Sequence, residues 1–189
     1  MIRCGITEKR LKNARFRKTE ETILRVFFEG ECRCICKLAK RAGVHRTTVY
    51  FHHHRVVAIP TDYQHYILYI YKKALTRIEK SSDLKIESVF EITLFFILQN
   101  KELFQVALRT GDTLVYRKMM IMLRPLIIEA IRLPKNSKRM FNVYAVSVAE
   151  LLDEWGKSGF KEAEMKELLK NILFLTKTFR TSLAPIMED

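Results

Sequence analysis

The segment from Cys34 to His54, CICKLAKRAGVHRTTVYFHHH, constrains the fold of this chain more than any other stretch. Its first half has apolar residues at helical spacing, which indicates one buried helix face: Ile35, Leu38, Ala39 and Ala42. Gly43 follows directly. Because glycine adopts a left-handed backbone conformation without a Cβ penalty, it suits the end of that helix. A second helix is expected to start near His45–Arg46.

The second helix is predicted to turn Val49 inward and to present a polar face to solvent, made of Arg46, Thr47, Thr48, Phe51 and His52. Two short helices joined by a tight turn are typical of the helix-turn-helix, whose second helix enters the DNA major groove. A glycine turn and an apolar face also occur in any helical hairpin, so this geometry alone does not decide the function.

The complete string is more specific. It has Leu-Ala-Lys-Arg-Ala-Gly-Val over residues 38–44, then Arg46, Thr48 and the pair Tyr50-x-His52, and it resembles the DNA-binding segment of TetR-family transcription regulators. The resemblance implies an all-α homodimer with a three-helix DNA-binding head, residues 1–60, and a helical effector-binding and dimerisation body, residues 61–189. It implies sequence-specific binding to a palindromic operator on double-stranded DNA, most often repression that a small-molecule effector relieves.

The resemblance also implies roles for single residues of the head. Contacts to base edges are expected from Arg46, Thr47 and Thr48, and contacts to phosphates from Lys40, Tyr50, His52 and Arg55. Cys36 stands where the family often has a DNA-facing polar residue, and Phe51 lies on the outer face. The family's usual Ser-Lys-Glu is replaced by Arg55-Val56-Val57. This departure leaves open a TetR-like co-activator or adaptor that acts through protein–protein contacts.

The charge is concentrated where DNA would bind. Residues 1–55 hold 14 Lys and Arg against 5 Asp and Glu, a net charge of +9, out of +13 for all 189 residues. Nucleic acid is the natural partner of such a region, because phosphate neutralisation releases counterions. Residues 1–17 are consistent with a flexible arm, a helical extension or a solvated tail. The next helix is expected to be capped near Thr19 and to end at Gly30.

Three cysteines, Cys32, Cys34 and Cys36, precede the three histidines His52–His54, so an all-α thiol or metal sensor is an alternative. The C-x-C-x-C spacing argues against it, since alternate helix residues point apart by roughly 200°. We expect reduced thiols and no metal or other cofactor. The first twenty residues lack the apolar core of a signal peptide and no apolar run has the length of a membrane span, so we expect a cytoplasmic protein without membrane contact.

The body is predicted to consist of about six helices, with glycine and proline sparse at six and four residues. The last two, about 138–157 and 161–181, carry long apolar stripes that we expect to form a four-helix dimer interface: Val143, Val146, Ala149, Leu168, Ile172 and Leu175. A mainly apolar effector pocket, without an obvious buried charge, is expected among Tyr66, Phe95, Gln99, Phe104, Tyr116 and Met120. No catalytic motif is present, and an enzyme is the least expected class.

Overall fold

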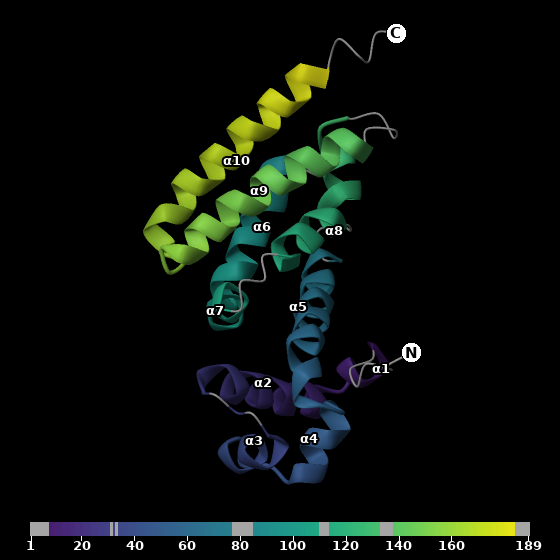
Figure 1. Ribbon diagram of the computed structural model, residues 1–189. Helices are drawn as coiled ribbons and strands as arrows, with labels where there is room; N and C mark the ends of the chain where they lie inside the picture. The colour runs from purple at the N-terminus through teal and green to yellow at the C-terminus, as the bar shows by residue number, and fades with distance from the viewer. Residues whose placement is uncertain are drawn as a thin grey trace. The chain divides into compact units, whose positions relative to one another are not determined.

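The computed structural model describes residues 8–30, 32, 34–76, 85–109, 114–132 and 138–183. These residues are all-α, as predicted: they form ten α-helices and one short 3₁₀-helix, without a strand (Figure 1). The chain divides into two compact units, an N-terminal unit, Met1–Ile70, and a C-terminal unit, Tyr71–Asp189. The division falls inside one long helix rather than at residue 60. None of the described helices is long and apolar enough to span a membrane.

The N-terminal unit starts with more helix than the sequence suggested. Its elements are α1 (Glu8–Leu11), α2 (Ala14–Glu29), α3 (Ile35–Arg41), α4 (Arg46–His52), the 3₁₀-helix η1 (Val56–Ala58) and the start of α5 (Ile59–Leu75). The expectation that Thr19 caps the second of these helices is wrong. Asn13 caps it instead, because its Oδ1 accepts hydrogen bonds from the backbone N–H groups of Arg15 at 2.9 Å and Phe16 at 3.2 Å.

The described part of the basic N-terminal segment, residues 8–17, is therefore mainly a helical extension, whereas residues 1–7 lie outside the described residues. Thr19 is a helix-interior residue whose hydroxyl donates to the carbonyl of Arg15 at 3.1 Å. Gly30 follows the last residue of α2, as expected.

The connection between α3 and α4 is the tight turn that the sequence predicts. The Cys34 Sγ accepts from the Lys37 N–H at 3.5 Å and caps the start of α3. Gly43 has a φ of 63°, the left-handed conformation that its position after α3 requires. The Val44 N–H then donates back to the Ala39 carbonyl at 3.0 Å. Val49 is fully buried, so the side of α4 that carries it faces the core of the N-terminal unit.

The C-terminal unit is a layered bundle of helices, α6 (Ile86–Gln99), α7 (Lys101–Arg109), α8 (Leu114–Ala130), α9 (Lys138–Lys157) and α10 (Glu162–Leu183) (Figure 1). Helix α9 packs against α7, α8 and α10, and α10 also packs against α6. A run of aromatic side chains fills the interior between them: Phe90, Phe104, Tyr116, Phe141, Tyr144 and Phe160. The sharp turn between α9 and α10 contains Gly159 at φ 92°.

Candidate nucleic-acid interface

The outer side of the α3–α4 pair carries most of the residues that were expected to meet DNA. Seven are exposed: Cys36, Lys40, Arg46, Thr47, Tyr50, Phe51 and Arg55. Thr48 is half-buried. Two large aromatic rings beside cationic side chains on one short surface helix form an unusual solvent face, since Tyr50 and Phe51 remain 49% and 54% exposed.

His52 does not belong to this face, and the expectation that it contacts a phosphate is wrong. It is only 2% exposed. Its Nδ1 lies 2.6 Å from Glu20 Oε2, and its ring stacks on Phe16 with the centroids 3.9 Å apart. The cause is helical geometry: His52 follows the buried Val49 by three positions, so both side chains share the inner face of α4. In the Tyr50-x-His52 pair, tyrosine points outward and histidine inward.

His52 is one end of a buried chain of four ionisable side chains, called here the His–Glu network. Glu20 of α2 lies between His52 and His53, with its Oε1 3.1 Å from His53 Nε2. His53 Nδ1 lies 2.7 Å from Asp62 Oδ2, in the first turn of α5. No side chain in the network is more than 3% exposed. His53 Nδ1 shares a hydrogen bond with Asp62, whereas its Nε2 lies at ion-pair distance from Glu20 Oε1 without the geometry of a hydrogen bond. Because a carboxylate faces each ring nitrogen, the surroundings of His53 favour the imidazolium.

The pKa values agree with this assignment. Burial by itself lowers the pKa of His53, but the hydrogen bond to Asp62 and the pairing with Glu20 outweigh burial and raise the pKa to about 9. Burial raises the pKa of Glu20, yet its contacts with His52 and His53 lower it by more, so this carboxyl is ionised at neutral pH. The His–Glu network therefore ties the C-terminal end of α4 to α2 and α5, and it fixes how α4 presents its outer face.

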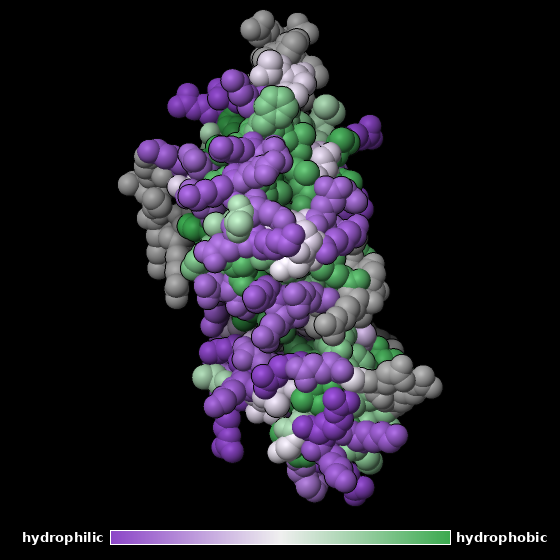
Figure 2. All heavy atoms as spheres, turned by 90° about the vertical axis from the view of Figure 1, so that its left-hand side faces the viewer, coloured by the Kyte–Doolittle hydropathy of each residue, from purple (hydrophilic) through white to green (hydrophobic). Residues whose placement is uncertain are grey.

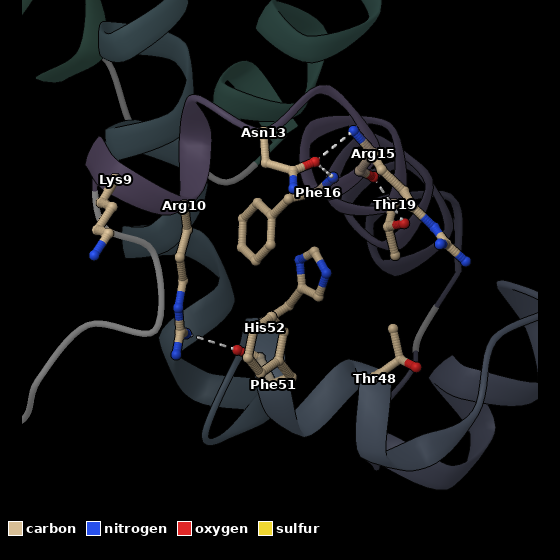
Figure 3. A pocket seen from close by; sticks show the side chains of 9 residues that line it. All are labelled: Lys9, Arg10, Asn13, Arg15, Phe16, Thr19, Thr48, Phe51 and His52. Carbon is tan, nitrogen blue, oxygen red and sulfur yellow. Dashed lines mark hydrogen bonds between the residues drawn. The ribbon is translucent and has the colours of Figure 1, made fainter.

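A hollow of about 570 Å³, called here the basic pocket, lies beside α4 (Figure 3). It is lined by Lys9, Arg10, Asn13, Arg15, Phe16, Thr19, Thr48, Phe51 and His52. The Arg10 guanidinium lies over the Phe51 ring, 4.3 Å from its centroid, and donates to the Phe51 carbonyl at 2.9 Å. Arg10 thus satisfies one of the free carbonyls at the end of α4 and holds the Phe51 ring in place.

Sequence reasoning missed Asn13, Glu20 and Asp62 as structural determinants of this region. Asn13 is an ordinary capping residue, but the basic run around it obscured the helix start. A signal for Glu20 was present, because it lies three and four positions before the buried Ile23 and Leu24 and so falls on the apolar face of α2. A carboxylate on an apolar face needs a buried partner, and adjacent histidines are suitable partners.

The six residues expected to form an effector pocket belong to both units and have different environments. Tyr66 belongs to the N-terminal unit, where it is buried and its hydroxyl donates to Glu21 Oε1. Phe95 and Gln99 are exposed on α6. The other three are fully buried in the C-terminal unit: Phe104, Tyr116 and Met120. The exposure of Phe95 and Gln99 does not fit an enclosed pocket shared with the three buried residues, because helical spacing alone does not determine which of two faces of α6 is buried. The effector pocket itself stays a prediction.

The effector pocket was expected to lack an obvious buried charge, but one of its six expected residues, Tyr116, lies near a buried carboxylate, Asp153. Asp153 is 3% exposed, and its Oδ2 pairs with Lys157 Nζ at 2.6 Å. Burial, and then the nearby Asp153 carboxylate, raise the pKa of the Tyr116 hydroxyl well above its usual range. Among the described residues, neither the Tyr116 hydroxyl nor Asp153 Oδ1 has a hydrogen-bond partner.

Of the six residues predicted to form the dimer interface, three are buried within the chain and two are exposed. Ala149, Leu168 and Ile172 are buried within the chain itself, because α10 packs against α6 and α9, so they cannot form a contact between copies. Leu175 is half-buried. Val143 and Val146 are exposed on α9, and α10 adds Phe174, 73% exposed, which sequence reasoning missed. Figure 2 shows apolar side chains between hydrophilic ones on the face of the C-terminal unit turned toward the viewer.

The three cysteines occupy different environments. Cys32 is buried, with Arg41 Nη1 3.8 Å from its sulfur, whereas Cys34 and Cys36 are exposed. No group of three or more His, Cys, Asp or Glu side chains in the described ranges is arranged to hold a metal ion. A comparison of this chain with protein-family profiles, curated proteins and solved structures found no match.

Proposed function

We propose that this protein is a sequence-specific DNA-binding transcription regulator of the TetR type, which binds as a homodimer to a two-fold-related operator. One observation carries the proposal. The residues that the TetR-like string assigns to DNA, other than His52 and the half-buried Thr48, lie exposed on α3, α4 and the residues directly after α4. They do so in the part of the chain with the highest positive charge.

The proposed roles follow from side-chain chemistry. Arg46 at the first turn of α4 presents a planar donor fork that matches the O6 and N7 acceptors of guanine, and Thr47 can contact either type of base edge. Lys40, Tyr50 and Arg55 are suited to phosphates, which position the protein without reading sequence. His52 is buried and therefore does not contact phosphate in this proposal. It supports α4 from inside through its contact with Glu20.

The proposed dimer uses the outer face of the α9–α10 pair. On α9, Val143, Ser147 and Leu151 follow one another at four-residue spacing, and on α10 Asn171, Phe174 and Thr178 do the same at three and four residues. A two-fold axis through this face would pair each helix with its copy in an isologous contact. The two α4 helices would then have to meet half-sites about 34–36 Å apart, or a multiple of that.

The proposed release of DNA by a small-molecule effector follows from the family resemblance. If an effector releases the protein from DNA, its binding free energy must be coupled reciprocally to that of DNA. Titration of candidate small molecules against the protein, with and without operator duplex, measures that coupling.

The experiment that tests DNA recognition is a selection of bound duplexes from a random library at physiological salt. Arg46→Ala should cost about 1–3 kcal/mol and relax the preference at particular base pairs. Tyr50→Ala should lower the affinity for all duplexes by the same factor. Arg117→Ala, which removes one exposed charge from the C-terminal unit, is the matched control. It should change neither the affinity for DNA nor the sequence preference. If the recovered duplexes showed no sequence preference, the result would contradict the proposed transcription regulator. It would favour the alternative, a TetR-like adaptor that acts through protein–protein contacts.

A further inference from the structure

The basic pocket has a composition that points to an anion. Its described lining contains three cations, Lys9, Arg10 and Arg15, and no carboxylate. Its remaining residues are neutral polar side chains and three aromatic rings, with the Phe16 and Phe51 rings 6.0 Å apart. A volume of about 570 Å³ is in the range of pockets that hold small ligands. A phosphate bonded to a sugar fits such a lining, because cations bind the phosphate and apolar rings pack against the sugar.

The pocket is continuous with the outer side of α4. Thr48 and Phe51 belong both to its lining and to the helix that we propose to enter the major groove (Figure 3). A helix in that groove, which is about 12 Å wide, runs between two phosphate backbones. Helix α3 can supply cations to one of them through Lys37 and Lys40. Lys9 of α1 and Arg15 of α2 lie beside α4 on separate elements and are exposed.

Arg10 has a different role in the basic pocket from that of Lys9 and Arg15. Its guanidinium is already engaged by the Phe51 carbonyl and ring, so it acts as a positioning residue for Phe51. The ring is thereby held at the edge of the pocket, where a deoxyribose or a thymine methyl group can pack on it. The positive charges of Lys9 and Arg15 remain available for incoming phosphates, one for each side chain.

We infer that the basic pocket holds a backbone segment of the DNA strand flanking α4, a deoxyribose with the phosphate on either side of it. Lys9 and Arg15, which lie on opposite sides of the pocket (Figure 3), are each the ligand of one of these two phosphates. The inference rests on the proposed DNA binding and extends the contact surface beyond the α3–α4 pair, to α1 and the start of α2. These contacts position the protein on the duplex and carry no sequence information.

The test compares two double variants of the full-length protein that each remove two exposed positive charges. One is Lys9→Ala with Arg15→Ala, and the matched control is Lys166→Ala with Lys170→Ala on α10. Affinity is measured against salt concentration for the selected duplex and for a random-sequence duplex. Losing two phosphate contacts should make the slope of log affinity against log salt shallower by about 1.8, equally for both duplexes, whereas the control should leave the slope unchanged.

A second arm locates the two phosphates. Duplexes in which single phosphates are replaced by neutral methylphosphonates should weaken wild-type binding at flanking positions. At two neighbouring positions, the substitution should no longer weaken DNA binding by the Lys9→Ala, Arg15→Ala variant. Additive losses at every position would overturn the inference. A third arm titrates inorganic phosphate without DNA; saturation of the Phe16 and Phe51 NMR signals below millimolar phosphate would assign the pocket to a free anion and also overturn it.

The outcomes separate this inference from the proposed function. If the wild-type protein selects a sequence and Arg46→Ala relaxes it, but the two double variants have the same salt slope, the regulator stands and the pocket assignment fails. If the Lys9→Ala, Arg15→Ala variant changes the salt slope but the wild-type protein selects no sequence, the pocket binds the DNA backbone and the proposed sequence-specific regulator is contradicted. If no duplex binds, both fail.

Discussion

The two units bury different chemistry. The centre of the N-terminal unit contains four ionisable side chains in contact, Glu20, His52, His53 and Asp62. Within the described part of the C-terminal unit, Asp153 is the single buried acid, and the interior is otherwise aromatic and aliphatic, with hydroxyl pairs such as Tyr71–Thr93 at 2.9 Å.

The difference teaches how each unit is stabilised. A buried ionic network offsets its own desolvation cost only while every member is paired, whereas apolar packing has no such condition. The stability of the N-terminal unit should therefore depend more strongly on pH and on the loss of one charge than that of the C-terminal unit, whose described residues include one buried carboxylate, Asp153, paired with Lys157. The single tryptophan, Trp155, lies in the C-terminal unit, so its fluorescence follows that unit, while far-UV circular dichroism follows both.

The largest effect is expected from Glu20→Ala. Removing the carboxylate leaves His53 buried beside Asp62 with one ring nitrogen unpaired, and breaking a buried ionic pair in this way costs about 3–5 kcal/mol. Denaturant unfolding should show the loss by circular dichroism, with the Trp155 fluorescence midpoint unchanged. Glu29→Ala, at an exposed position of the same helix, is the control and should stay within about 0.5 kcal/mol of wild type. A loss below about 1 kcal/mol for Glu20→Ala would mean that the network is dispensable.

The second effect is a pH dependence confined to the N-terminal unit. The pKa of His53 rises from 6.5 to about 9 on folding, so its contribution is complete below pH 6.5 and is lost as the pH rises through about 9. This difference corresponds to about 3 kcal/mol. The unfolding free energy of wild type minus that of His53→Gln should fall between pH 6.5 and 9. A difference that stays constant over this range would contradict the imidazolium assignment.

A third, smaller effect should appear in each unit separately. Gly43 and Gly159 both have positive φ and open space around the position of a Cβ, so alanine there meets backbone strain and no clash. Each substitution should cost about 1–2 kcal/mol. Gly43→Ala should shift the circular dichroism transition and leave the Trp155 transition unchanged. Gly159→Ala should shift the Trp155 transition and, in circular dichroism, only the part of the signal that comes from the C-terminal unit. If both glycine variants shifted both transitions equally, the units would unfold as one, and the comparison would lose its basis.

The smallest effect on folding is expected from Val143→Glu combined with Phe174→Glu. Both side chains are exposed in the single chain, so the stability of its fold should change by only about 0.5 kcal/mol. Sedimentation should nevertheless show a monomer, since the charges would oppose each other across the proposed two-fold contact. Ile121→Glu, at another exposed apolar position, is the control and should remain a dimer. A dimeric double variant would remove the α9–α10 face as the interface.

Much of the fold follows from the sequence. Helix α6 starts and ends where its apolar periodicity does, and the φ of Gly43 is what the end of α3 demands. The site is less predictable. Periodicity shows that a helix has an inner face but not which neighbour covers it, so Leu168 and Ile172 were expected between copies although α10 packs them within the chain.

The His–Glu network could not be derived from spacing either. It joins Glu20 to His52, 32 residues apart, and His53 to Asp62 through a different element. Local pattern does not encode such pairings, although the carboxylate on the apolar face of α2 shows that a partner is required. The same holds for Arg10 and Phe51, which meet across 41 residues.

We propose that α4 reads DNA sequence while the His–Glu network holds this helix from inside. The most direct test is the affinity of the full-length protein for its selected duplex and for a scrambled duplex of equal length, at physiological salt. Arg46→Ala should reduce the ratio of the two affinities, with the unfolding free energy unchanged. Glu20→Ala, measured under conditions where the protein stays folded, should weaken binding to both. A wild-type ratio of one, or a ratio that Arg46→Ala leaves intact, would contradict the account.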